Sequence, residues 1–165
     1  MTTPITGLSP YHVELIHHDK DPEALQGVLR MWLRNGAMAE PEAKRRLSEV
    51  ICVIRHSPSG EVVGVSTAYA SLLPGGTQRV YLYRMFVDPV HRGKTIPHRQ
   101  PWIAAQTIEA LRESYHSDQT IGVVAILENQ RIPDRLMHSS GWTKMQRLWQ
   151  GNRMFCVQFT EEKIH

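Results

Sequence analysis

The feature that most constrains the fold of this 165-residue chain is an almost unbroken apolar run at residues 121–127, Ile-Gly-Val-Val-Ala-Ile-Leu. A half-exposed strand alternates apolar and polar residues, whereas a continuous short run is typical of a strand that is buried on both faces. The run is also far shorter than the roughly 18 apolar residues that span a bilayer. It therefore predicts a buried strand, and the surrounding elements decide the rest of the fold.

An amphipathic helix is predicted before residue 35, because five apolar residues between positions 25 and 33 recur at three- and four-residue spacing. Asp21 is a favoured N-cap, and Pro22 is a favoured first helical residue. Asn35-Gly36 predicts the end of the helix, since both residues tolerate the left-handed backbone conformation.

Apolar periodicity and turn residues predict the remaining elements, in the order strand, two helices, three strands, helix, strand, helix, two strands. No internal repeat or linker interrupts them, so residues 1–165 are predicted to form a single domain. The other predicted strands are residues 11–16, 51–55, 62–71, 78–87, 142–149 and 153–159, with a final turn at Gly151-Asn152, and the other helices start at Pro41, between Pro97 and Pro101, and at Ile132, the last ending at Ser140.

Composition indicates an ordinary globular domain, with 41% apolar residues, 21% charged residues and a net charge of +3. Cys52 and Cys156 lie among apolar neighbours and are expected to be buried, reduced thiols. The first ten residues lack the charged and apolar segments of a signal peptide. A cytoplasmic protein without a membrane span is therefore expected. The basic excess suits an anionic partner, which includes a coenzyme, a nucleic acid and a membrane surface.

The segment from Tyr81 to Trp102 predicts an anion site, because a strand ends at Val87 and a basic turn leads into a helix. A helix N-terminus carries unpaired N–H groups and partial positive charge, to which Arg92 and Lys94 add whole charges. Such a turn suits a pyrophosphate, and a solvated basic loop is the alternative. A nucleotide-binding P-loop is disfavoured, because Asp88 stands where its first glycine belongs.

The order of elements and the run Met-Phe-Val-Asp-Pro-Val-His-Arg-Gly-Lys at residues 85–94 resemble the GNAT acetyltransferase superfamily. In that family, a strand with this ending runs into an Arg-Gly-x-Gly-x-Gly loop and then a helix. Asn129 and the Ser-Gly-Trp ending at Trp142 match two further family positions. The resemblance covers about residues 11–159.

The resemblance implies an α/β (α+β) fold with a mixed, mostly antiparallel sheet of about seven strands. That sheet is splayed between the fourth and fifth strands and flanked by four helices. It also implies acetyl-CoA as acyl donor, with no metal. The implied coenzyme-binding residues are the backbone of the fourth strand, the following loop and one asparagine, namely Met85, Phe86, Val87, Arg92, Gly93, Lys94, Thr95, Ile96, Pro97 and Asn129.

The sequence departs from the family pattern at several of these positions. Thr95 and Pro97 replace two loop glycines, and Pro101 favours a later start for the helix than Pro97. The tyrosine that many members use as general acid is Met137 here, and Tyr83 stands near the position of their acidic residue.

Tyr83 and His138 are consequently the candidate catalytic residues, acting directly or through a water molecule. Histidine titrates near pH 6.5, which suits proton transfer at neutral pH. An exposed histidine favoured by the helix dipole is the alternative interpretation of His138.

The resemblance implies acyl transfer from a coenzyme A thioester to an amine of a small molecule or peptide. One alternative is a longer acyl-CoA or an acyl carrier protein. A second is an inactive GNAT-like binding module, although no array of stacking aromatics supports nucleic acid. The acceptor is not constrained, and the terminal hairpin leaves homodimer formation open. The basic side chains that suit an acidic carrier are Arg79, Arg84, Arg92, Lys94 and Arg99.

Overall fold

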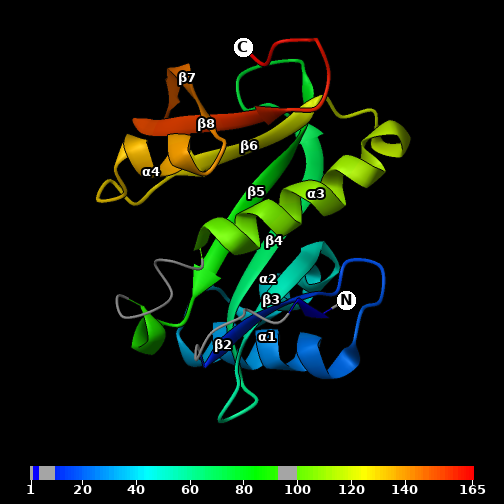
Figure 1. Cartoon of the computed structure of the whole chain (residues 1–165), viewed down its shortest axis with the longest axis vertical. Coiled ribbons are helices and arrows are strands. Elements are labelled where there is room, and N and C mark those ends of the chain that lie inside the picture. The colour runs from blue at the N-terminus through cyan, green and yellow to red at the C-terminus, as the bar shows by residue number, and fades with distance from the viewer. Residues whose placement is uncertain (1, 4–9, 93–99) are drawn as a thin grey trace. The chain divides into compact units, whose positions relative to one another are not determined.

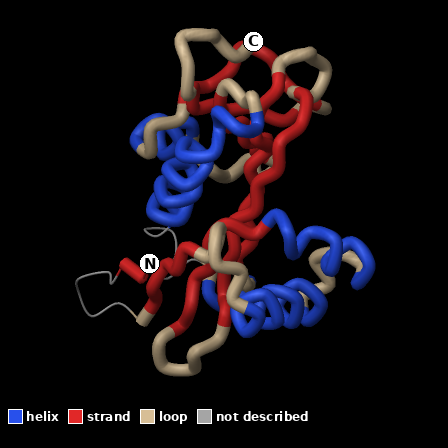
Figure 2. The backbone as a smooth tube through the Cα atoms, turned by 90° about the vertical axis from the view of Figure 1, so that its right-hand side faces the viewer, coloured by secondary structure: helices blue, strands red, loops and turns tan. Residues whose placement is uncertain are grey.

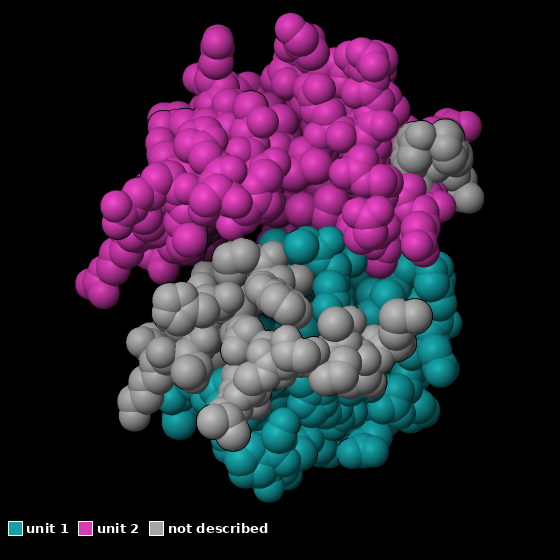
Figure 3. All heavy atoms as spheres, in the orientation of Figure 1, with its two compact units in different colours: residues 1–67, 85–107 teal, residues 68–84, 108–165 magenta. Residues whose placement is uncertain are grey.

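The computed structural model describes residues 2–3, 10–92 and 100–165 (Figure 1). Its compact parts are unit 1, residues 1–67 and 85–107, and unit 2, residues 68–84 and 108–165 (Figure 3). Helices and strands are interspersed along the chain (Figure 2), and both units contain elements of each kind. Two strands and one helix continue from one unit into the other, so each unit is discontinuous in sequence.

The strands are β1 (Thr2–Thr3), β2 (Tyr11–Leu15), β3 (Val50–His56), β4 (Val62–Leu72), β5 (Arg79–Val87), β6 (Gly122–Leu127), β7 (Thr143–Trp149) and β8 (Asn152–Gln158). The helices are α1 (Pro22–Arg34), α2 (Glu40–Arg46), α3 (Gln100–Asp118) and α4 (Asp134–Ser139), with short 3₁₀ turns η1 (Leu47–Glu49) and η2 (Pro89–His91).

The sheet is mixed and mostly antiparallel, in the order β1-β2-β3-β4-β5-β6-β8-β7. The β5–β6 pair is parallel, whereas the β1–β2, β2–β3, β3–β4, β6–β8 and β7–β8 pairs are antiparallel. This confirms the predicted fold class. The strand count differs, because β1 was not predicted: its two threonines carry no apolar pattern.

Helix α1 begins at Pro22, as predicted, and Asp21 caps it by accepting hydrogen bonds from the backbone of Glu23 (3.2 Å) and Ala24 (3.3 Å). Val28 and Trp32 of the predicted apolar stripe are buried in the core of unit 1, whereas Leu33 at its end is exposed. A Cβ on Gly27 would lie 2.7 Å from Val62, so glycine at this position permits the close packing of α1 on β4.

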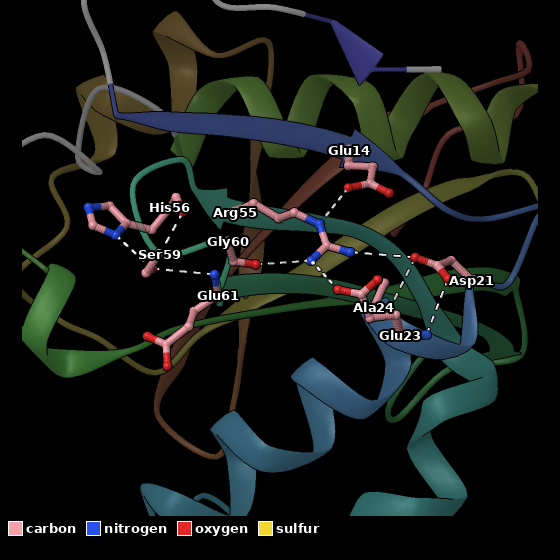
Figure 4. A network of polar contacts seen from close by, with 9 residues as sticks. All are labelled: Glu14, Asp21, Glu23, Ala24, Arg55, His56, Ser59, Gly60 and Glu61. Carbon is pink, nitrogen blue, oxygen red and sulfur yellow. Dashed lines mark hydrogen bonds and ion pairs between the residues drawn. The ribbon is translucent and has the colours of Figure 1, made fainter.

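Arg55 joins β3 to β2 and to the start of α1 (Figure 4). Its guanidinium donates to Glu14 (2.8 Å) and to the Gly60 carbonyl (3.1 Å), and it pairs with Asp21 (3.5 Å) and Glu23 (3.8 Å). The side chain is 14% exposed. A cation this far buried is stabilised only when carboxylates and hydrogen bonds satisfy it, and Arg55 has both.

Polar side chains connect the other face of β3 and β4 to α3. Ser66 Oγ lies 2.6 Å from Thr107 Oγ1, which donates to the Ile103 carbonyl, and the Cys52 amide donates to Ser66. Burial raises the pKa of the Cys52 thiol to about 11. Cys52 is therefore a protonated, unreactive thiol at neutral pH, as its apolar sequence neighbours predicted.

Unit 2 has one apolar layer on each face of its strands. Val80, Leu82, Val124 and Met154 pack together on one face. The other face carries an aromatic contact, in which Tyr81 lies 6.4 Å from Phe159 between ring centroids. The predicted burial of residues 121–127 is largely confirmed, since Val123 and Val124 on opposite faces are both fully buried.

The final hairpin turns one residue earlier than predicted. Trp149 pairs with Asn152, and the two residues between them, Gln150 and Gly151, both have positive φ (50° and 79°). Positive φ at both positions is the type I′ geometry that matches the twist of antiparallel strands. The predicted turn at Gly151-Asn152 was wrong. Glycine and asparagine commonly adopt positive φ and glutamine rarely does, so the sequence did not indicate Gln150 as a turn residue.

Helix α3 begins at Gln100, which agrees with the later start that Pro101 favours. Helix α4 is shorter than predicted at its N-terminal end and starts after Pro133. In the part of the chain that the structure describes, no helix is long and apolar enough to cross a membrane.

Candidate active site on strand β5

Strand β5 has neighbours on both sides in the sheet, yet its middle is poorly covered by protein. Five consecutive side chains, from Leu82 to Phe86, are only partly buried, although they alternate between the two faces. On the neighbouring strand β6, Val124 and Ala125 beside Leu82 and Tyr83 are buried, whereas Ile126 and Leu127, farther along, are also only partly buried. Partial exposure on both faces of an inner strand is a favourable setting for a ligand.

In the described part of the chain, the backbone of β5 continues past the last residue that pairs with β6. The Arg79 carbonyl accepts from Ile121, whereas the Asp88 amide donates to Val63 of β4 (2.8 Å). Because backbone groups alternate along a strand, odd-numbered residues of β5 face the β6 side and even-numbered residues face β4. Among the described residues, the β5–β6 ladder ends at Tyr83.

Two of the three predicted coenzyme-binding residues of β5 therefore have backbone groups on the unpaired side, namely Met85 and Val87. The third, Phe86, has its backbone on the β4 side. Its ring instead packs against the core of unit 1 and lies under Arg92, whose guanidinium carbon is 5.3 Å from the ring centroid.

Asp88 closes the strand and begins η2. Its carboxylate accepts a hydrogen bond from the Val90 amide (3.1 Å) and pairs with Arg34 of α1. The side chain is only 4% exposed. Burial opposes ionisation, but the hydrogen bonds from Val90, Arg34 and Asn35 outweigh it and lower the pKa of Asp88 below its usual value near 3.8. Its negative charge is thus neutralised locally and is not presented to an anion.

Arg92 lies where the predicted anion-binding loop begins. Its Nε donates to the Val87 carbonyl at 2.7 Å, so the guanidinium is held at the end of β5. The side chain is otherwise exposed. From the sequence, Arg92 was expected to be an exposed loop residue. In the structure its Nε is held by the Val87 carbonyl, and its terminal nitrogens remain available to bind an anion.

The other loop residues predicted to bind the coenzyme, Gly93, Lys94, Thr95, Ile96 and Pro97, lie outside the described residues and remain predictions. Asn129 is exposed after β6, and its Oδ1 accepts from the Arg131 amide at 3.0 Å. This local turn fixes the orientation of the Asn129 side chain, with the amide nitrogen directed away from that bond.

The two predicted catalytic residues, Tyr83 and His138, both contact Trp142. The Tyr83 and Trp142 ring centroids are 5.6 Å apart, and His138 Nδ1 lies 3.2 Å from the Trp142 carbonyl oxygen. Tyr83 pairs with Ala125, and Ala125 pairs with Phe155, so these residues share one face of the sheet. His138 also meets Phe155 edge-on at 6.1 Å.

The contact with the Trp142 carbonyl determines which nitrogen of His138 is available. A carbonyl oxygen accepts only, so the neutral imidazole keeps its proton on Nδ1 and leaves Nε2 with a free lone pair. That tautomer can accept a proton at Nε2. The side chain is exposed, which gives it access to solvent.

Ion pairs hold α4, and with it His138, on the final hairpin. Asp134 pairs with Lys144 of β7 (2.8 Å) and with Arg153 of β8. The hydrogen bonds from Lys144 and Arg153 lower the pKa of Asp134. The position of His138 is therefore determined by the register of β7 and β8.

Sequence reasoning missed one feature of this region, the contact of Arg84 with Tyr69. Arg84 Nη2 donates to the Tyr69 hydroxyl at 2.9 Å, and its guanidinium carbon lies 5.0 Å from the Tyr69 ring centroid. The sequence offers no signal for this pair, because it depends on how β4 and β5 align. Among the described residues, no group of three or more histidines, cysteines and acidic residues is arranged to hold a metal ion.

No protein-family model matches the sequence, and no curated protein matches it. Solved structures do match its fold. The ribosomal-protein-S5-alanine acetyltransferase of Vibrio fischeri is 14% identical, with a TM-score of 0.59 over 99% of this chain and 100% of that one.

Two further structures are similar to the same extent. The Salmonella typhimurium protein yncA, solved with its cofactor acetyl-CoA, is 15% identical, with a TM-score of 0.57 over 94% of this chain and 98% of its own. A GNAT-family acetyltransferase of Listeria monocytogenes is 12% identical, with a TM-score of 0.53 over 96% and 99%. The strand order, the parallel β5–β6 pair and these similarities lead to one conclusion: the chain has the fold of the GNAT acetyltransferases.

Proposed function

We propose that the protein is an acyltransferase, which moves an acetyl or related acyl group from a coenzyme A thioester to an amine of a small molecule or peptide. The observation that carries this proposal is that, among the described residues, β6 pairs with β5 only as far as Tyr83, while Arg92 meets the Val87 carbonyl at the end of the strand. The pantetheine arm of coenzyme A contains amide groups, which bind the backbone of Met85 and Val87 as a missing strand would.

Charge complementarity supports the same assignment. Arg92 is anchored through Nε at the end of β5, and Asp88 is neutralised by Arg34. The strand end therefore carries net positive charge where residues 93–97 continue the chain. The coenzyme pyrophosphate is proposed to bind there, with Asn129 as a further coenzyme contact after β6.

The proposed chemistry is direct transfer. The amine nitrogen attacks the thioester carbonyl carbon, the carbon–sulfur bond breaks, and the amine proton is lost while the thiolate gains one. The Met85 and Val87 amides are the candidate donors to the oxyanion, because their N–H groups face the unpaired side of the strand. Tyr83 and His138 are the proposed proton-transfer residues, the latter through Nε2.

Thermal melts with coenzyme A, acetyl-CoA and magnesium-ATP test this proposal. A ligand at one hundred times its dissociation constant stabilises a protein by about 2.7 kcal/mol, which corresponds to about 5–10 °C for a chain of this size. We expect this shift with both thioester-family ligands and not with ATP. A shift with ATP alone, or with none of the three, would contradict the proposal.

A further inference from the structure

Arg84 is a cation on the poorly covered part of β5 whose donors are largely unused. A guanidinium has five N–H donors, and the structure records one hydrogen bond for Arg84, from Nη2 to the Tyr69 hydroxyl. Nη1 is shielded from solvent and has no hydrogen-bond partner. In the described part of the chain, Arg84 forms no ion pair with any carboxylate.

This arrangement is unfavourable for a charged side chain. Removing a charged group from water is unfavourable unless an opposite charge or several hydrogen bonds compensate it. The hydroxyl of Tyr69 is neutral and supplies only one bond. The side chain as a whole is partly exposed, so Arg84 lies at the protein surface and not within the core.

Tyr69 holds the guanidinium in a defined orientation. One contact is the 2.9 Å hydrogen bond to Nη2, and the other places the guanidinium carbon 5.0 Å from the ring centroid. A fixed planar guanidinium matches the two oxygens of a carboxylate. Val80 and Leu82 precede Arg84 on the same face of β5 and are packed in the apolar layer, so the charge stands at the margin of that layer.

Resting on the proposed function, we infer that Arg84, oriented by Tyr69, binds a carboxylate of the acceptor amine. Arg84 precedes Met85, whose backbone is the proposed thioester contact, and neighbouring Cα atoms are about 3.8 Å apart. The acceptor carboxylate and its reacting amine must therefore be close together, as they are in amino acids and other small amino carboxylic acids.

The inference also assigns a direction of attack. Arg84 and Tyr83 are consecutive residues of a strand, so their side chains lie on opposite faces of the sheet. An acceptor held by Arg84 approaches the thioester from the face opposite Tyr83. Tyr83 then delivers a proton to the departing thiolate, and the amine proton leaves to water on the Arg84 face.

Acetyl transfer to matched amines tests this inference, with release of free coenzyme A thiol as the readout. The panel pairs amino acids with their carboxamides and includes β-alanine beside phosphoethanolamine. We expect kcat/KM for the carboxylate member of a pair to exceed that of its amide by about tenfold to a hundredfold, as for a charged bidentate contact. R84Q should abolish this preference, and Y69F, which removes the hydroxyl that orients the guanidinium, should weaken it.

R79Q is the matched control, because it removes one exposed positive charge from the same strand and should retain the preference. R84K keeps the charge without the planar fork and should restore part of the preference. Equal use of carboxylates and amides, preference for phosphoethanolamine, or a preference that survives in R84Q would overturn the inference. So would a protein that binds coenzyme A but acetylates no carboxylate-bearing amine. Failure to bind coenzyme A would instead overturn the proposed function itself.

Discussion

Two arginines on different strands, Arg55 on β3 and Arg84 on β5, have very different surroundings. Arg55 is surrounded by three carboxylates and a backbone carbonyl, and it connects β2, β3 and the start of α1 (Figure 4). Arg84 meets one tyrosine hydroxyl and one aromatic ring. The first arginine is satisfied by the fold, whereas the second leaves donors unused.

The surroundings differ in the same way. Val53 and Ile54, which lead to Arg55 on β3, are fully buried. The residues next to Arg84 on β5 are partly exposed on both faces. This contrast teaches that protein contacts satisfy the charge of Arg55, and it is the reason for proposing that a ligand binds at the middle of β5.

The largest expected effect concerns the proton-transfer residues beside β5. Y83F and H138Q should each lower kcat if the residue transfers a proton, by about a hundredfold to ten-thousandfold for the more important of the two. Stability should change little in Y83F, since the ring stays against Trp142. Steady-state kinetics and urea denaturation measure the two effects, and unchanged kcat in both variants would exclude these residues.

Substitution of Arg55 should lower stability and leave coenzyme binding unchanged. R55M leaves Glu14 without its 2.8 Å hydrogen bond and removes the support of the α1 cap at Asp21. We expect a loss of about 1.5–3 kcal/mol in the free energy of unfolding, the range for hydrogen bonds between charged groups. Coenzyme binding at a temperature where the variant is folded should be unchanged, and a loss of stability below 0.5 kcal/mol (roughly the limit for ordinary surface changes) would remove the contrast.

Arg92 should combine both kinds of effect. R92A is expected to weaken coenzyme A binding by about 1.5–3 kcal/mol and to lower stability by about 0.5–1.5 kcal/mol through the lost bond to Val87. R30A, which removes an exposed arginine on α1 away from the proposed site, is the control for overall charge. Calorimetric titration should show weaker binding for R92A alone; equal affinities would leave Arg92 as a structural residue.

The Asp88 carboxylate predicts how stability depends on pH. Its pKa is lowered in the folded protein, so its ionised form contributes stability above the usual value near 3.8, and this contribution is lost as the pH falls through the folded pKa. D88N should therefore be less stable than the unaltered protein at pH 7, by about 1–2 kcal/mol. The difference should shrink in acid, and a constant difference between pH 7 and pH 2.5 (roughly one unit below the usual value) would contradict this assignment.

The smallest effect is expected for the stability of R84M. Removing a cation that has no carboxylate partner among the described residues should change the free energy of unfolding by about 0.5 kcal/mol or less, or should stabilise the protein. Comparison with R55M by urea denaturation makes this the direct test of the contrast. A loss as large as that of R55M would show that Arg84 supports the fold.

Local patterns in the sequence predicted most of the fold. The Asp21 cap, the start of α1 at Pro22 and the buried strand near residue 124 depend on neighbouring residues, and all are found in the structure. The hairpin turn was misplaced by one residue, because strand pairing imposes positive φ on Gln150. Strand β1, the additional strand that was not predicted, depends on pairing with β2, and its own residues do not indicate a strand.

The sequence could predict only the part of the candidate site that is formed by consecutive residues. Met85 to Val87 and Arg92 belong to one continuous segment, so the resemblance of that segment could indicate them. The Tyr69–Arg84 contact joins residues 15 positions apart on different strands. The direction of each backbone group on β5 also depends on partners in β4 and β6, which the sequence does not specify.

The most direct test of the central claim is amide hydrogen exchange at Met85, Phe86 and Val87, measured with and without saturating coenzyme A. The account predicts that exchange at Met85 and Val87 slows when the coenzyme binds, because their amides face the unpaired side of β5. The Phe86 amide, on the β4 side, should exchange slowly in both states. Unchanged exchange at Met85 and Val87 in the saturated protein would contradict the assignment of this edge as the coenzyme site.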